Sequence, residues 1–140
     1  MSIEIKYDQN RKMLNIVISG TSDFAEYSSA FETITHSCDY PPNVRTLWDF
    51  RNADLSFANF TSVKKMVGIR EQFKQRNNCR VALIASSNLQ YGFCRMFQTL
   101  LEDKLPHELA VFREYDDGEQ WLLENHRDGH EIFLKSKKHR

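Results

Sequence analysis

The sequence has no excess of charge of either sign. Its 140 residues include 19 Lys and Arg and 19 Asp and Glu, so the formal net charge at pH 7 is zero with neutral histidines. Non-specific DNA binding needs a basic surface that releases counterions. A balanced chain has no overall field that favours a nucleic acid or a membrane surface. We therefore expect no nucleic-acid partner.

The chain is also poor in cysteine and in long apolar runs. Cys38, Cys79 and Cys94 are odd in number, widely spaced and without a C-x-x-C pair, which is typical of reduced thiols rather than of disulfides or a zinc knuckle. The N-terminus MSIEIKYDQN has no apolar secretion segment, and no run reaches the length that spans a bilayer. We expect a cytoplasmic protein with no stable membrane insertion.

Motifs that carry chemistry are missing as well. No G-x-S-x-G elbow, G-x-G-x-x-G turn, Walker loop or H-E-x-x-H helix is present. His126 and His130 have an i, i+4 spacing, but Gly129 would break the helix that makes this spacing useful for a metal. Cys94 lies beside Arg95, which could lower the pKa of its thiol, but among large apolar neighbours it fits a small buried hydrophobe better. We expect no metal and no cofactor.

What the sequence does contain is enough apolar material for one core. Hydrophobic residues make up 41% of the chain, and a domain of this size buries about two thirds of its unfolded surface. We expect a single domain over residues 1–126 and a basic tail over residues 127–140. The tail holds EIFL followed by KSKKHR, and it could dock on the domain or on a second copy of it in a homodimer.

Hydrophobic periodicity predicts five strands. Strict alternation over residues 3–7 and an apolar run over residues 13–18, joined by a short polar turn, predict an antiparallel hairpin. Further apolar runs predict strands over residues 44–50, 81–85 and 109–112. The run at 81–85 has no polar residue, as in a central parallel strand that is covered on both faces.

Four amphipathic helices are predicted between and after these later strands. Three of them begin with capping-box spacings. In a capping box the side-chain oxygen of the N-cap residue accepts a hydrogen bond from the third helical residue's N–H, and that residue's side chain accepts one from the N–H of the N-cap residue. The three pairs are Asp23 with Glu26, Ser87 with Gln90, and Asp116 with Glu119. The remaining helix is predicted over residues 59–75, with Gly68 at a close approach to the sheet. The side chains expected to face inward are Phe60, Val63, Met66, Val67, Ile69 and Phe73 in this helix, and Leu89, Phe93, Met96, Phe97 and Leu100 in the helix that begins after Ser87.

The predicted element order is β-β-α-β-α-β-α-β-α. This order is typical of an α/β domain with right-handed crossovers. We expect a mainly parallel five-stranded sheet that starts with the antiparallel hairpin.

This order and several stretches resemble the SpoIIAA-like group, which is related to STAS domains and more distantly to CRAL-TRIO lipid carriers. The resemblance covers roughly residues 3 to 124, a single-domain span. The matching stretches are LWDFRNADLS, VALIAS, YGFCRMF and AVFREYDDGEQWL, and their distinctive positions are Asp49, Gly92, Arg95, Phe112 and Trp121.

The resemblance implies a regulatory role in which the domain binds a partner protein such as an anti-sigma factor. In STAS regulators a serine in an Asp-Ser-Ser-Gly-like loop after the third strand is phosphorylated. Here the corresponding region reads ADLSFANFTS, which contains Ser56, Thr61 and Ser62 but not that motif. We therefore expect Ser56 or Asn59 to act as a helix N-cap.

Candidate binding residues gather where the predicted strands end. In open α/β sheets, ligands bind beyond the carboxyl ends of the strands. Asp49 and Arg51 are candidates to orient polar groups of a ligand, or alternatively to pair with each other. Arg113 follows the fifth strand at the same edge. The full set of candidate ligand- or partner-binding residues is Asp49, Arg51, Asp54, Ser56 and Ser86, together with Tyr91 and Arg95 on the helix that faces this edge.

The sequence leaves three functions open. The first is a non-catalytic regulatory or ligand-sensing module that binds a protein or a small molecule at the carboxyl edge. The second is a carrier of a lipid or other apolar molecule in a cavity between helices and sheet, because the chain is rich in aromatic residues there: Phe24, Tyr27, Phe31, Phe57, Phe60, Tyr91, Phe93 and Phe97. The third is a small enzyme that uses the polar edge.

Overall fold

The computed structural model describes residues 3–37, 40, 44–56, 58–71, 80–102 and 108–124. The predictions for the C-terminal tail, for His126 and His130, and for Cys38, Cys79, Phe57 and Phe73 lie outside the described residues. The elements are β1 (Ile3–Asp8), β2 (Met13–Gly20), α1 (Phe24–His36), β3 (Arg45–Ala53), α2 (Phe60–Glu71), β4 (Arg80–Ile84), α3 (Asn88–Leu101), β5 (Glu108–Phe112) and α4 (Tyr115–Leu123). The predicted order of strands and helices is confirmed.

The strands form one sheet in the order β1-β2-β3-β4-β5. β1 and β2 pair antiparallel, whereas β2, β3, β4 and β5 pair parallel. The carboxyl ends of these last four strands therefore lie along one edge, which we call the carboxyl edge. The expected α/β fold with an N-terminal hairpin is confirmed.

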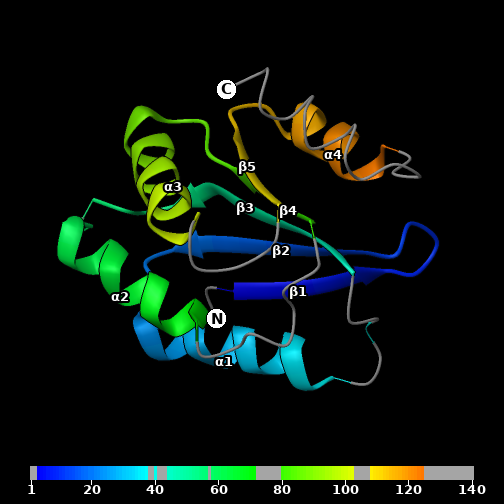
Figure 1. Ribbon diagram of the computed structural model, residues 1–140, viewed down its shortest axis with the longest axis horizontal. Coiled ribbons are helices and arrows are strands. Elements are labelled where there is room, and N and C mark those ends of the chain that lie inside the picture. The colour runs from blue at the N-terminus through cyan, green and yellow to red at the C-terminus, as the bar shows by residue number, and fades with distance from the viewer. Residues whose placement is uncertain are drawn as a thin grey trace.

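Two helical layers enclose the sheet (Figure 1). Helices α1, α2 and α3 cover one face, and α4 covers the other face over β3, β4 and β5. The larger core cluster lies under the three helices, and the smaller one lies under α4. Alternate residues of the central strands enter opposite clusters, for example Trp48 the first and Leu47 the second, as the two-residue period of a strand requires.

Two of the three predicted capping boxes are confirmed. Asp23 accepts a hydrogen bond from the backbone N–H of Glu26 at 2.8 Å, and Ser87 accepts one from that of Gln90 at 3.1 Å. The third prediction is wrong. Helix α4 begins one residue before Asp116, and its N-cap residue Glu114 makes no side-chain capping bond.

The third strand is longer than predicted. β3 continues past residue 50 to Ala53, because pairing with β2 resumes after an irregularity and joins Ser19 to Asn52 and Gly20 to Ala53. Arg51 and Asn52 thus remain in the sheet. Asp49 lies inside the strand and not at its exit, which corrects the expectation from the sequence.

Some predicted inward-facing positions are also wrong. Phe60, Leu89 and Met96 are exposed to 54%, 51% and 38%. Phe60 and Leu89 stand in the first turns of their helices. Gly68 is exposed, and a Cβ added there would meet nothing within 4 Å, whereas a Cβ on Gly118 would collide with Ile84 and contact Phe112. The close approach to the sheet is therefore made by α4, not by α2.

No helix in the described ranges has both the length and the apolar character needed to cross a bilayer.

Candidate functional site at the carboxyl edge

The ends of β3 and β4 are joined by Gln90, a buried residue in the first turn of α3. Its Oε1 accepts hydrogen bonds from the backbone N–H groups of Ser86 and Ser87, both at 3.1 Å. Its Nε2 donates to the carbonyl oxygens of Arg51 at 3.2 Å and Ala53 at 3.0 Å. One side chain therefore satisfies backbone groups at the end of β3 and just after β4, and it sets their separation. The sequence identified Gln90 only as part of a capping box.

The end of β5 joins the same edge through Arg113. Its guanidinium stacks over the ring of Tyr91, with 4.3 Å between Cζ and the ring centroid, and donates to the carbonyl oxygen of Ser86 at 3.4 Å. The structure thus brings Ser86 and Tyr91 together, as the shared edge requires. The sequence placed Arg113 at this edge, directly after the fifth strand, but did not include it among the candidate binding residues.

Asp54 and Ser56 form an exposed turn after β3. The backbone N–H of Asp54 donates to the carbonyl oxygen of Gly20 at 3.0 Å, which ties the exits of β3 and β2 together. Its carboxylate accepts from the N–H of Ser56 at 3.0 Å. Hydrogen bonds from Ser56 lower the pKa of Asp54, so this exposed carboxylate stays charged. A negative, solvated group therefore stands at this end of the edge.

Asn59, rather than Ser56, is placed to cap α2. Its Oδ1 accepts from the backbone N–H of Ser62 at 3.0 Å, and Asn59 directly precedes the first residue of the helix. This geometry is the usual N-cap bond. The expectation that Ser56 or Asn59 acts as the cap is confirmed for Asn59.

Asp49 and Arg51 lie on the face of the sheet that α4 covers. Asp49 is 4% exposed, and its carboxylate accepts from Nε of Arg51 at 2.9 Å and from Nη2 at 2.8 Å. The Arg51 guanidinium lies over the ring of Tyr115, with Cζ 4.9 Å from the centroid. The hydrogen bond with Asp49 raises the pKa of Arg51. The two residues pair with each other, which was the alternative to orienting a ligand.

Two residues that the sequence did not single out complete this cluster. Asn15 of β2 donates from Nδ2 to the hydroxyl oxygen of Tyr115, the first residue of α4, at 2.5 Å. Burial raises the pKa of Tyr115, so its hydroxyl remains protonated at neutral pH. The only sequence signal was a polar residue within an otherwise apolar strand. The cluster fastens the start of α4 to β2 and β3.

Arg95 and Cys94 lie farther along α3. Cys94 is fully buried, and burial raises the pKa of its thiol, so the prediction of a small buried hydrophobe is confirmed. Within the described residues, the Arg95 side chain makes no hydrogen bond or ion pair with the residues of the carboxyl edge. Of the seven candidates, Arg95 is the one that no described contact joins to the edge.

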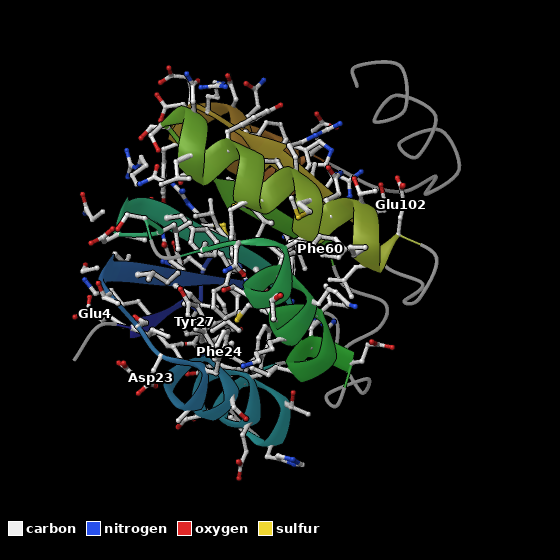
Figure 2. The ribbon with its side chains drawn as sticks, turned by 90° about the vertical axis from the view of Figure 1, so that its left-hand side faces the viewer. Glu4, Asp23, Phe24, Tyr27, Phe60 and Glu102 are labelled. Carbon is white, nitrogen blue, oxygen red and sulfur yellow. The ribbon has the colours of Figure 1, made fainter. Side chains whose placement is uncertain are left out.

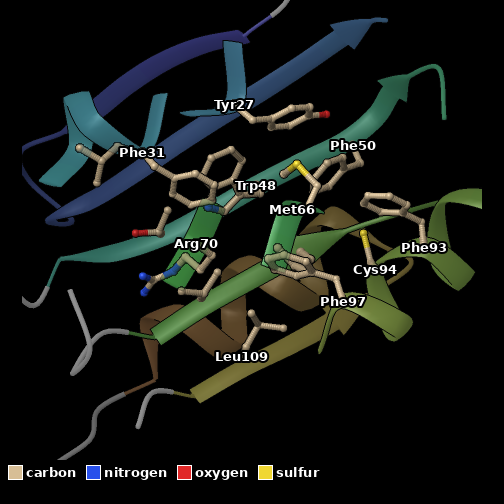
Figure 3. Close-up of a pocket in the computed structure, with 14 residues that line it drawn as sticks. Tyr27, Phe31, Trp48, Phe50, Met66, Arg70, Phe93, Cys94, Phe97 and Leu109 are labelled. Carbon is tan, nitrogen blue, oxygen red and sulfur yellow. The ribbon is translucent and has the colours of Figure 1, made fainter. Parts of the chain in front are cut away.

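The face of the sheet that α1, α2 and α3 cover contains a small apolar cavity of about 50 Å³ (Figure 3). It is lined by residues of α1, α2 and α3 and of the strands below them, and the labelled rings of Tyr27, Phe93 and Phe97 surround it (Figure 3). A dry apolar cavity that holds benzene measures about 150 Å³. The cavity is therefore too small, in this conformation, for an aromatic ring or a lipid chain.

Metal ligands do not cluster in the part of the chain that the structure describes. No group of three or more His, Cys, Asp or Glu side chains is close enough there to hold an ion.

This architecture is that of a SpoIIAA-like α/β domain. A protein of the DUF3478 family with a SpoIIAA-like fold, from Shewanella loihica PV-4, matches the structure with a TM-score of 0.57 and 18% identity, over 86% of this chain and 92% of that chain. An anti-sigma factor antagonist from Mycobacterium paratuberculosis matches with a TM-score of 0.51 and 15% identity, over 88% and 96% of the two chains. At such identities the likeness shows the fold alone, and for the fold it confirms the resemblance seen in the sequence.

Comparison with protein-family models gives no match, and comparison with curated protein sequences gives none either.

Proposed function

We propose that this protein is a non-catalytic regulatory module that binds a partner protein at its carboxyl edge. One observation carries the proposal. The two most exposed large apolar side chains of the described residues, Phe60 at 54% and Leu89 at 51%, both stand in first turns of helices that follow this edge. Apolar side chains surrounded by polar groups are the usual composition of a protein interface.

The polar groups of the carboxyl edge fit the same role. Gln90 holds the ends of β3 and β4 in fixed positions, and Tyr91 with Arg113 adds an aromatic and cationic pair. Tyrosine and arginine are enriched where protein interfaces are strongest. A surface that is already ordered also loses less conformational entropy when a partner binds.

Likeness of fold supports a regulatory role in a general way. One solved protein with this fold is an anti-sigma factor antagonist, which by its name acts in regulation. We propose a comparable role for this chain, in the cytoplasm, where its sparse cysteines would stay reduced.

The enzyme alternative has less support. Acid–base catalysis needs a titratable group with a perturbed pKa in a cleft. Asp49 is the buried carboxylate near this edge, and both of its oxygens accept hydrogen bonds from Arg51. The carrier alternative would need a larger cavity than the one of about 50 Å³.

Site-specific photo-crosslinking in the cells of origin tests the proposal. A photoreactive amino acid is placed at Phe60 or Leu89, and a control copy carries it at Gln120, an exposed position on α4. We expect the first two positions to capture the same protein and the control position not to capture it. Leu89→Asp should remove the crosslink from position 60. Equal capture from all three positions, or none from positions 60 and 89, would rule the proposal out.

A further inference from the structure

Two lysines of α2 lie over two phenylalanines that begin neighbouring helices. The Nζ of Lys64 is 5.5 Å from the ring centroid of Phe60, and the Nζ of Lys65 is 5.3 Å from that of Phe24. Phe24 is the first residue of α1, and Phe60 is the first residue of α2. The two helices pack against each other, and Figure 2 shows both rings on the side that faces the viewer. We call these four residues the basic–aromatic patch.

The positive charge of this patch has no ion-pair partner among the described residues, although the chain has as many acidic as basic residues. The first turn of α2 contains no acidic residue either. By contrast, Lys6 on the hairpin pairs with Glu4 at 3.2 Å. Within the part of the chain that the structure describes, the patch thus combines an exposed ring with two cations that form no ion pair.

We propose that the basic–aromatic patch binds an acidic segment of a partner protein that also carries apolar side chains. This inference rests on the proposed function and names the chemistry of the partner. Carboxylates of the segment would pair with Lys64 and Lys65, and an apolar side chain would cover the ring of Phe60. Opposite charges at the rim of an interface chiefly steer encounter and select partners, while an aromatic ring supplies contact area.

A protein segment fits this patch better than an anionic membrane. Segments that recognise anionic lipid usually carry roughly four to eight Lys and Arg side chains. The patch has two, in a chain with zero net charge. Lasting attachment to a bilayer also needs an apolar face that penetrates it, and here a single ring is widely exposed.

Two synthetic amphipathic peptides of equal length serve as probes. The acidic peptide consists of Leu and Glu, and the basic peptide has Lys at every Glu position. Backbone amide NMR signals of the full-length protein are followed during titration. We expect the acidic peptide to shift signals of residues 24–27 and 60–65 in a saturable way, and raised salt to weaken the binding at least threefold. The basic peptide should cause no such shifts.

Matched variants locate the effect. The double variant Lys64→Glu with Lys65→Glu should bind the acidic peptide at least fivefold more weakly than the parent protein. Phe60→Ser should also weaken this binding. Lys6→Glu makes a charge change of the same kind on an exposed strand residue and should leave binding unchanged. The fold of each variant is checked by the dispersion of its amide signals, and a variant that loses the fold is replaced by Lys64→Gln with Lys65→Gln.

Several results would overturn the inference. Shifts of equal size with both peptides, or shifts outside the patch, would remove the charge argument. Tighter binding to phosphatidylcholine–phosphatidylglycerol vesicles than to the peptide, abolished by the double Glu variant, would assign the patch to a membrane. Loss of the monomer in sedimentation, reversed by the same variant, would assign it to a second copy of the chain. If crosslinks at position 89 persist while the acidic peptide does not bind, the inference about the patch is wrong but the proposed function stands.

Discussion

Gln90 donates a hydrogen bond from its buried side chain to the carbonyl oxygen of Ala53, 37 residues earlier in the chain, at 3.0 Å. The oxygen of the same side-chain amide accepts a hydrogen bond from the backbone N–H of Ser87, the N-cap residue of α3, as part of a capping box. A local capping motif and a long-range strand contact are therefore made by one side chain. The geometry of the proposed binding edge depends on it.

Replacing this side chain tests its role. Gln90→Ala removes the donor for two carbonyl groups and one half of a capping box, so we expect unfolding to become easier by about 2–4 kcal/mol. Urea denaturation followed by circular dichroism measures the change. Gln120→Ala, at an exposed position of α4, should stay within about 0.5 kcal/mol of the parent. Similar losses in the two variants would contradict the assigned role.

The ion pair of Asp49 and Arg51 should respond asymmetrically to mutation. Asp49 is 4% exposed, whereas the Arg51 side chain is 44% exposed. Arg51→Met leaves a carboxylate buried without its counter-charge and should cost about 2–4 kcal/mol. Asp49→Asn leaves a cation that water can still reach and should cost about 1 kcal/mol.

Arg11→Met is the control for this asymmetry, because Arg11 belongs to a more exposed pair with Glu119. Its loss should cost less than about 1 kcal/mol. Equal costs for the Arg51 and Asp49 variants in denaturant titrations would show that burial of the carboxylate does not matter.

Two glycines in helices should give opposite results when changed to alanine. Gly118→Ala places a Cβ against Ile84 and Phe112, so it should destabilise the protein by about 1–3 kcal/mol through overpacking. Gly92→Ala in α3 meets nothing within 4 Å and should stabilise it by up to about 1 kcal/mol through helix propensity. Thermal melting of both variants checks the signs. A gain in Gly118→Ala would mean that α4 is not held so close to the sheet.

Stability should fall at alkaline pH because of Cys94. Burial raises the pKa of its thiol in the folded protein, while a thiol in an unfolded chain titrates near 8.5. Above that pH the unfolded state loses a proton that the folded state keeps, so the free energy of unfolding decreases as pH rises. The contribution reaches at most about 1.4 kcal/mol per pH unit.

Denaturation between pH 7 and 10 measures this dependence. Above pH 9, the free energy of unfolding of the Cys94→Ala variant should fall less steeply with pH than that of the parent protein, whatever the stability of the variant at pH 7. Parallel curves for the two proteins would contradict the burial of an uncharged thiol at this position.

Several local features of the candidate site could be predicted from the sequence. The Ser87 and Gln90 capping box depends on residues three positions apart, and the polar residues after each strand indicated the carboxyl edge. The pairing of Asp49 with Arg51 was one of two stated alternatives. It forms because β3 extends past Arg51 and residues two apart in a strand share a face. Asn15 and Tyr115 were missed, and the contacts of Arg113 could not be predicted, because their partners are distant in the chain.

The amino-acid sequence by itself determined the kinds and order of the elements and the antiparallel start of the sheet, because periodicity, capping and short turns act over a few residues. Only the tertiary structure decided where β3 ends, since its last pairs are made with β2. It also decided that Phe60 and Leu89 face solvent and that Gly118 touches the sheet. Burial depends on which layer lies opposite a residue, and that layer comes from a distant part of the chain.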